Sequence, residues 1–216
     1  MAKPGRHEEG ARTRERVLGA AARLIASRGY AATSVAQIAR ASGANPASIY
    51  WAFGSKEGLF AAVMERSAES WFLAVAERPR GEDPWESLKG LAEAFRSGPE
   101  FLRLLLVLSL ERRDGDPTVL KAARRVRAQA AQDLARMYRP ALGIEDELAG
   151  RRIAMRLARL TLMLLDGVFV ASQIEVDSID MDREFELIAI STKATAERLV
   201  EEARDESCGP EKGKLA

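Results

Sequence analysis

The chain has 216 residues, 47% of them hydrophobic, and its 33 basic and 32 acidic side chains nearly cancel. This composition is typical of a soluble globular protein of one or two domains. No apolar run approaches the roughly 20 residues that a membrane span needs, and a single cysteine, Cys208, excludes an intrachain disulfide. We therefore expect a cytoplasmic protein.

The charges are unevenly distributed along the chain. Residues 1–60 contain nine basic and four acidic side chains, whereas residues 161–216 contain six basic and thirteen acidic ones. A basic front and an acidic rear indicate a nucleic-acid-binding end and a separate body. Residues 1–10 are basic and poor in apolar side chains, so we expect a flexible basic arm there, which either touches DNA or has no role.

The first predicted helix covers residues 11–27, and Gly29 ends it. Three cations, Arg12, Arg14 and Arg16, lie near its start, where the helix dipole disfavours positive charge. Contact with phosphates would explain this placement, and solvated surface charge is the alternative.

A helix-turn-helix is predicted between Ser34 and Phe53. Ser34 and Gln37 have the spacing of a capping box at the start of a first helix, and Gly43 favours its end. Asn45, followed at once by a proline, suits the start of a second helix. Two short helices joined by a tight glycine-containing turn are typical of a helix-turn-helix, whose second helix enters the major groove of DNA.

The second helix has large side chains on its expected outer face. Ile49 and Phe53 are four residues apart and can anchor the helix inward, which leaves Tyr50 and Trp51 outside. A tyrosine hydroxyl can donate to a phosphate oxygen. Alternatively, Tyr50 and Trp51 pack against neighbouring helices. Further candidates for contacts with phosphates or base edges are Gln37, Asn45, Ala47 and Ser48.

The turn that follows predicts a phosphate contact. Ser55 can cap the next helix, and Glu57 complements its positive end. Lys56 has no evident acidic partner in this turn, and the N–H groups of a helix start bind anions readily. We therefore expect Lys56 and these N–H groups to hold a phosphate.

These elements together resemble the DNA-binding domain of the TetR-type (TetR/AcrR) transcriptional regulators, from about residue 13 to residue 64. The matching residues are Arg16-Val17-Leu18, Ala21, Leu24-Ile25, Arg28-Gly29-Tyr30, Thr33-Ser34-Val35, Ile38-Ala39, Gly43 and Ser48-Ile49-Tyr50-Trp51-Ala52-Phe53-Gly54-Ser55-Lys56-Glu57-Gly58-Leu59. The resemblance implies a homodimer that binds a palindromic operator, and a C-terminal helical domain that binds a small molecule.

The resemblance also implies roles for individual positions. Tyr50 and Lys56 match the usual phosphate contacts of the family, and Thr33 and Ser34 match its contacts at the start of the second of its three DNA-binding helices. Two positions depart from the family pattern. Asn45 and the proline after it stand where Ser or Thr followed by a polar residue is common, which leaves the base preference open, and Ser42 stands where Ala is common.

The remainder of the chain is predicted to be helical, with starts and stops marked by Pro, Gly and Asp. A long helix over 55–78 leads out of the DNA-binding part, and further helices are expected over 84–97, 99–111, 117–138, 145–173 and 182–204. The predicted fold is all-α with about nine helices. It comprises a helix-turn-helix domain at 11–54, a helical effector-binding and dimerisation domain at 55–204, and a flexible tail at 205–216.

The last two predicted helices are too apolar for one-sided surface helices. Such excess apolar surface indicates a subunit interface, and the resemblance implies the same, through a four-helix bundle. The alternative is that both are core helices of a monomer. The residues predicted at the interface are Leu157, Leu164, Val168, Ile188 and Leu199.

An apolar ligand pocket is predicted in the middle helices, where aromatic and leucine side chains gather with a few polar groups. Ordinary core packing is the alternative. The predicted lining consists of Trp71, Phe72, Phe101, Leu104, Leu105, Leu108 and Asp166. Further polar candidates are Arg103, Ser109 and Glu111.

No catalytic, metal or cofactor site is expected. The only histidine, His7, lies in the predicted arm, and no Cys or Ser has a base at a readable spacing. Asp177, Asp180 and Asp182 lie in a helix-breaking link, where solvated acids are the better interpretation than a cation site. The sequence predicts a DNA-binding transcriptional regulator, a repressor that a small apolar molecule releases from its operator. The alternative is a helical protein that sequesters small molecules and has lost operator binding.

Overall fold

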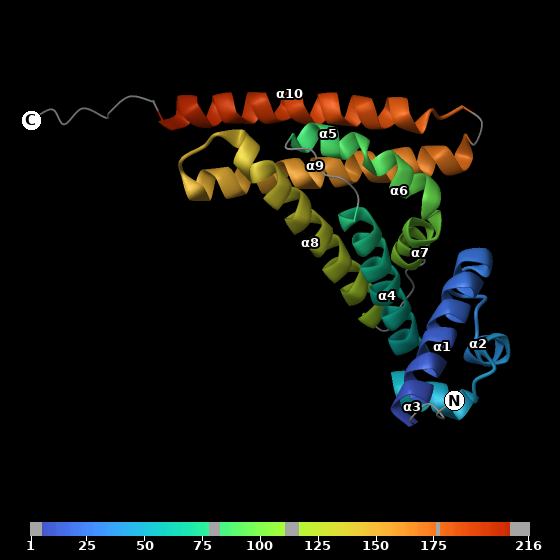
Figure 1. Ribbon diagram of the computed structural model, residues 1–216. Helices are drawn as coiled ribbons and strands as arrows, with labels where there is room; N and C mark the ends of the chain where they lie inside the picture. Colours follow the sequence, from blue (N-terminus) through green and yellow to red (C-terminus); the bar gives the residue numbers. More distant parts are fainter. Residues whose placement is uncertain (1–5, 78–82, 111–116, 176–177, 208–216) are drawn as a thin grey trace, which may run out of the picture. The chain divides into compact units, whose positions relative to one another are not determined.

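The structure is a computed structural model that describes residues 6–77, 83–110, 117–175 and 178–207 (Figure 1). These residues form ten α-helices, one short 3₁₀ turn and no strand, which confirms the predicted all-α class. The elements are α1 Arg6–Arg28, α2 Val35–Ser42, α3 Pro46–Phe53, α4 Lys56–Ala76, α5 Pro84–Lys89, α6 Leu91–Ser97, α7 Pro99–Leu110, α8 Thr118–Tyr138, η1 Arg139–Leu142, α9 Glu147–Ile174 and α10 Met181–Ser207.

Three boundaries differ from the prediction. Helix α1 begins at Arg6, so residues 6–10 of the predicted arm are helical, and the acidic Glu8 and Glu9 in its first turn complement the helix dipole. The helix predicted over 84–97 is two helices, α5 and α6, divided at Gly90, because glycine is a poor helix former. Helix α10 continues to residue 207, while Cys208 lies outside the described residues.

The chain divides into two compact units. Unit 1 comprises residues 1–77 and 94–127, and unit 2 comprises residues 78–93 and 128–216. The division passes through α8, whose first half belongs to unit 1 and whose second half belongs to unit 2. The domain limits predicted at residues 54 and 204 stay predictions. No described helix combines the length and apolar character that a membrane crossing requires.

Unit 1 has one hydrophobic core shared by the predicted DNA-binding helices and the start of the body. Leu59, Phe60, Val63 and Met64 of α4 are fully buried, and α4 packs against α1, α3 and α7. Leu104 of α7 belongs to the same cluster. Because this core joins α4 to both α1 and α3, a displacement of α4 within unit 1 would disturb the recognition elements.

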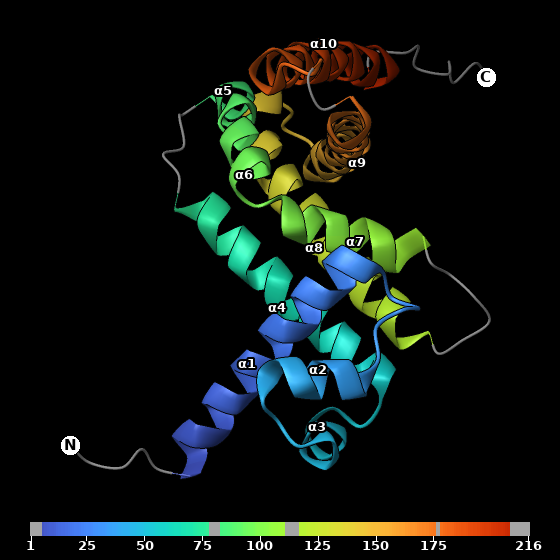
Figure 2. The same cartoon turned by 90° about the vertical axis from the view of Figure 1, so that its right-hand side faces the viewer.

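Unit 2 is built on α9 and α10, which lie side by side along much of their length (Figures 1 and 2). At its centre Trp85 of α5 stacks on Tyr138 at the end of α8, with ring centroids 5.2 Å apart. The Tyr138 hydroxyl and the Thr161 hydroxyl are 2.8 Å apart, and Thr161 donates to the Leu157 carbonyl at 2.9 Å. Tyr138 is therefore the donor to Thr161, and burial raises the pKa of its phenol.

We expect Tyr138→Phe to lower the free energy of unfolding by about 1 kcal/mol, the usual net value of one buried hydrogen bond. The cost stays small because Thr161 keeps its bond to the Leu157 carbonyl. Thermal and urea unfolding of the wild type and the variant measure the difference. An unchanged midpoint would show that the hydroxyl pair contributes nothing to the folded state.

The structure corrects two of the five predicted interface residues. Leu157 is fully buried and Ile188 is 5% exposed within a single chain, so they pack in the core of unit 2. Leu164, Val168 and Leu199 are partly buried. The large apolar side chains that these two helices expose in the described chain instead include Met163, Val170, Ile174, Leu187 and Ile190.

Candidate nucleic-acid interface

The helices α2 and α3 and the turn between them are bounded by caps whose residues are close together in the sequence (Figure 2). The Ser34 side chain accepts from the Gln37 backbone N–H at 3.3 Å, and the Gln37 side chain accepts from the Ser34 N–H at 2.8 Å. Gly43 ends α2 with φ +68°, a left-handed conformation that glycine adopts at little cost. Asn45 then caps α3 by accepting from the Ala47 N–H at 2.9 Å. The predicted helix, turn and helix are therefore present.

Two long-range contacts fix α3 in place. Ile49 is 2% exposed and anchors the helix in the core of unit 1. The Arg14 guanidinium of α1 lies 4.5 Å from the centroid of the Phe53 ring, a cation–π geometry. Arg14 was predicted as a candidate phosphate contact, and its stacking on Phe53 is a role that sequence spacing alone could not reveal.

Close approach of the backbone fixes the end of α3 against the start of α4. A Cβ atom at Gly58 would lie 2.2 Å from the Phe53 carbonyl oxygen. Ser55 caps α4 by accepting from the Gly58 N–H at 3.0 Å. Glycine at position 58 is therefore a steric requirement of the connection between the two helices.

The outer face of α3 carries the side chains predicted to meet DNA. Asn45, Ala47 and Ser48 are exposed. Tyr50 is 49% exposed and Trp51 is 90% exposed. The alternative, that both aromatic residues pack against neighbouring helices, does not hold for Trp51 within the described chain.

Lys56 lies at the first position of α4, directly after Ser55. Its ammonium is 4.8 Å from the centroid of the Tyr30 ring and 5.4 Å from that of Phe60. These two rings meet edge to face at 4.9 Å, and the Tyr30 hydroxyl donates to Glu57 at 3.3 Å. The aromatic pair therefore holds the cation beside the N–H groups of a helix start, where an anion binds most readily.

The structure corrects the role expected for Thr33. This side chain is 1% exposed, and its hydroxyl donates to the Gly29 carbonyl at 2.8 Å. Thr33 thus supports the turn between α1 and α2. Ser34 and Gln37 lie nearer the surface, but their side chains are bonded to each other in the capping box.

The residues predicted to line a pocket divide into three groups. Phe101, Leu104, Leu105 and Leu108 of α7 are buried in the core of unit 1. Trp71 and Phe72 of α4 are partly buried, and their ring centroids lie 5.5 and 6.3 Å from that of Phe101. Asp166 belongs to α9 in unit 2. Of the further polar candidates, Arg103 is exposed, and the Ser109 side chain and Glu111 lie outside the described residues.

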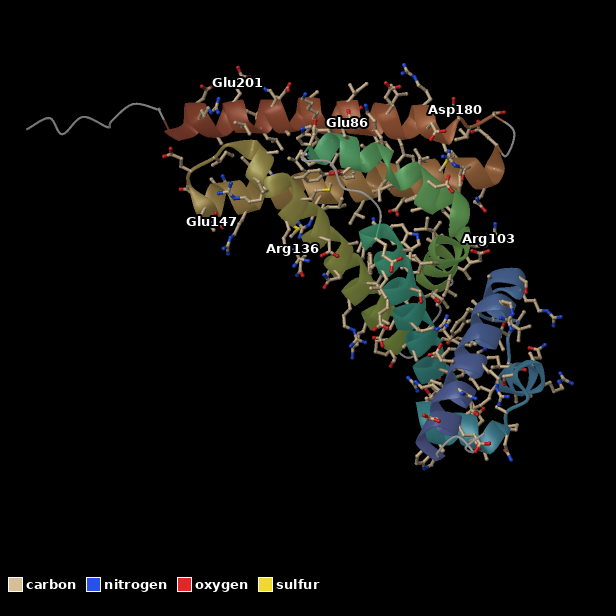
Figure 3. All side chains as sticks on the ribbon, viewed as in Figure 1. Glu86, Arg103, Arg136, Glu147, Asp180 and Glu201 are labelled. Carbon is tan, nitrogen blue, oxygen red and sulfur yellow. The ribbon has the colours of Figure 1, made fainter. Side chains whose placement is uncertain are left out.

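Of the three aspartates in the predicted link, Asp180 has a structural role. Its carboxylate accepts from the backbone N–H groups of Asp182 and Arg183 at 3.1 and 3.2 Å, which caps the start of α10 (Figure 3). Asp177 lies outside the described residues.

A capped helix, a left-handed glycine turn and an anchored second helix with an exposed polar and aromatic face together define a helix-turn-helix protein. Residues 17–63 match the family model described as bacterial regulatory proteins, tetR family. The resemblance to the TetR-type transcriptional regulators is therefore confirmed.

Curated relatives match part of the chain. The chain is 32% identical over 110 residues to the HTH-type transcriptional repressor NicS of Pseudomonas putida. This alignment covers 49% of this chain and 52% of NicS. It is 37% identical over 86 residues to the HTH-type transcriptional repressor BdcR of Escherichia coli. This second alignment covers 38% of this chain and 44% of BdcR. The chain thus aligns with about half the length of these relatives.

Solved structures match the fold over most of the chain. A transcriptional regulator from Rhodococcus sp. has a TM-score of 0.69 and 16% identity, and the match covers 83% of this chain and 95% of the other. A TetR transcriptional regulator from Legionella pneumophila has a TM-score of 0.64 and 19% identity, with coverage of 90% and 99%. At these identities the comparison shows the shared fold.

Proposed function

We propose that this protein is a sequence-specific DNA-binding transcriptional regulator whose helix α3 enters the major groove. The observation that carries the proposal is the geometry of α3. Its inner side is anchored by Ile49, while Trp51 is 90% exposed and Tyr50 is 49% exposed. A large aromatic side chain left so open to water on a helix-turn-helix is well explained by a partner surface. The similarity to NicS and BdcR, both named as transcriptional repressors, supports a repressor.

The exposed groups divide by what they can recognise. Lys56 and the Tyr50 hydroxyl suit phosphate oxygens, which position the protein without reading sequence. Ala47, Ser48 and Trp51 lie on the exposed face of the recognition helix, where base edges and thymine methyl groups would be met. Arg12 and Arg16 are exposed on α1 and suit further phosphates.

We expect Lys56→Ala and Tyr50→Phe each to weaken binding about equally on all DNA sequences, because phosphate contacts carry no sequence information. For Lys56→Ala, the slope of log K against log salt should fall by about one. Fluorescence anisotropy with labelled duplexes over a salt series measures both quantities. Lys121→Ala, at an exposed position of α8, is the matched control and should leave the slope unchanged. A large change in sequence preference would show instead that these residues read bases.

The binding unit that we propose is a homodimer on a palindromic operator. Two copies of α3 would reach successive major grooves, roughly 34–36 Å apart. The apolar side chains exposed on α9 and α10, among them Met163, Ile174 and Ile190, support an interface on these helices. Two subunits per duplex in analytical ultracentrifugation would agree with this proposal, and one subunit at saturation would contradict it.

A small apolar effector is the proposed signal, and α4 is its proposed route to the DNA-binding helices. The Trp71 indole N–H, towards the end of α4, is buried without a hydrogen-bond partner among the described residues, so a ligand oxygen there would satisfy it. The start of the same helix carries Lys56. Two of the matched solved structures are described as a fatty acid degradation regulator, FadR, and as a regulator in complex with choline. Identical spacing of α3 within the dimer, with and without effector, would argue against this route.

A helical protein that sequesters small molecules and no longer binds an operator remains the second candidate. The aromatic cluster of Trp71, Phe72 and Phe101 would serve both functions equally well. DNA binding distinguishes them, because the sequestering protein would retain only weak binding that is independent of sequence.

A further inference from the structure

A groove of about 440 Å³ opens in unit 2, where the end of α8, the η1 turn and the start of α9 meet. Its volume lies in the range of small-molecule sites. Part of its lining is apolar and is formed by Ala135, Pro140, Ala154 and Met155. None of these residues belongs to the predicted effector pocket, which centres on Trp71 and Phe101 of unit 1.

The groove also contains an arginine that is held in advance of any ligand. Arg139 donates to the Ile144 carbonyl at 2.9 Å and to the Glu147 carboxylate at 2.8 Å. Its guanidinium packs on the backbone of α9 at Gly150, where a Cβ atom would lie 2.5 Å from the Arg139 Cζ. Glycine inside a helix costs about 1 kcal/mol relative to alanine, so its presence here is explained by the space that Arg139 needs.

Guanidinium groups outnumber carboxylates among the described residues that line the groove. Arg136, Arg139 and Arg151 line it, and Glu147 is the acid among its lining residues. Glu147 is shared, because Arg151 donates to it at 2.6 Å and Arg139 at 2.8 Å. Hydrogen bonds, first from Arg151 and then from Arg139, lower the pKa of Glu147. Arg136 pairs with Asp133, which leaves the set with an excess positive charge.

One nitrogen of Arg139 is a hydrogen-bond donor without an acceptor. Its Nε is buried without a hydrogen-bond partner among the described residues. Such groups are rare in folded proteins and usually indicate a bound water, ion or ligand. The groove itself combines an apolar wall with excess positive charge, and Arg139 Nε lies beside the α9 backbone at Gly150.

We propose that this groove binds a small monocarboxylate with an apolar body. The carboxylate meets the guanidinium groups of Arg136 and Arg151, since arginine recognises carboxylates through paired hydrogen bonds. The apolar body lies on Ala154 and Met155. The site is separate from α3, so it does not depend on whether the protein binds DNA.

The test uses octanoate as the probe, octan-1-ol as its uncharged match, and the full-length protein labelled with ¹³C at the methionine methyl groups. Met155 lines the groove, so its methyl resonance, assigned with Met155→Leu, reports binding at this place. We expect a saturable shift of the Met155 signal with octanoate and a much weaker one with octan-1-ol.

Three substitutions distinguish a binding role from a structural one. Arg136→Gln and Arg151→Gln should each raise the apparent Kd for octanoate about tenfold, the usual value of one charge-assisted hydrogen bond. Glu147→Gln should lower the Kd, because it removes the carboxylate that competes for Arg151. Arg159→Gln, at an exposed arginine of the same helix, is the control and should change nothing.

Opposite signs for the arginine and glutamate substitutions would support the proposal, since a loss of folding would weaken binding in all of them. The proposal would be overturned by an unmoved Met155 signal, by equal shifts with octan-1-ol, or by unchanged affinity in both arginine variants. Operator binding measured on the same samples reports separately on the DNA-binding function.

Discussion

Replacing Gly58 by alanine is expected to weaken operator binding roughly 100-fold. The added Cβ would lie 2.2 Å from the Phe53 carbonyl oxygen, a backbone atom that cannot rotate away. Relief requires the end of α3 to move from the start of α4, and forced overpacking of this kind costs about 3 kcal/mol. If this strain displaces α3 from the position in which it binds DNA, the affinity for the operator drops roughly 100-fold. DNA binding by anisotropy and thermal unfolding of the same sample measure the two effects.

Gly19→Ala is the matched control for this substitution. Gly19 lies in α1, in the same unit, and a Cβ atom there would meet only the tip of the flexible Arg23 side chain at 3.6 Å. Alanine at such a helical position should be neutral or stabilising by about 0.5–1 kcal/mol. Wild-type operator affinity in Gly58→Ala would show that α3 and α4 do not need this close approach.

Replacing Trp51 by alanine is expected to weaken operator binding at least tenfold without changing stability. The side chain is 90% exposed, so its removal should alter the free energy of unfolding by less than about 0.5 kcal/mol. A good contact in the major groove is worth about 1–3 kcal/mol of discrimination, so sequence preference should also relax. Competition between operator and non-specific duplexes measures this change.

Leu110→Ala controls for the loss of an exposed apolar side chain as such. Leu110 is 77% exposed at the end of α7, outside the helices α9 and α10 of the proposed dimer interface. It should bind the operator like the wild type. If Trp51→Ala also binds like the wild type, Trp51 makes no contact with DNA and the role proposed for α3 is wrong.

The features that could be predicted from the sequence are those that neighbouring residues determine. The capping box of Ser34 and Gln37, the left-handed Gly43 and the Asn45 cap each involve residues within a few positions of one another. Their chemistry is independent of the rest of the fold, so the two helices and the turn agree with expectation. The exposure of Trp51 follows from the same local helical spacing.

The features that could not be predicted join distant parts of the chain. Tyr30 lies under the Lys56 ammonium, and no local pattern pairs these two residues. The same holds for the Arg14 contact with Phe53. Spacing also could not tell which of two apolar faces of a helix is inside, so Leu157 was placed at an interface although it is fully buried.

The roles of two glycines also could not be predicted from the sequence. Gly58 and Gly150 lie inside the helices α4 and α9, where glycine is less favourable than alanine. Each is explained by an atom that comes close in space, the Phe53 carbonyl oxygen for Gly58 and the Arg139 guanidinium for Gly150. Only the packed structure identifies those neighbours.

Binding of the purified protein to DNA fragments from the upstream region of its own gene, over a salt series, tests the central claim most directly. We expect tight binding to one palindromic fragment with two subunits per site, weakened at least tenfold in Trp51→Ala. Weak binding that is equal on every fragment and lost steeply with salt would contradict it, because only the sequence-independent phosphate contribution would then be present.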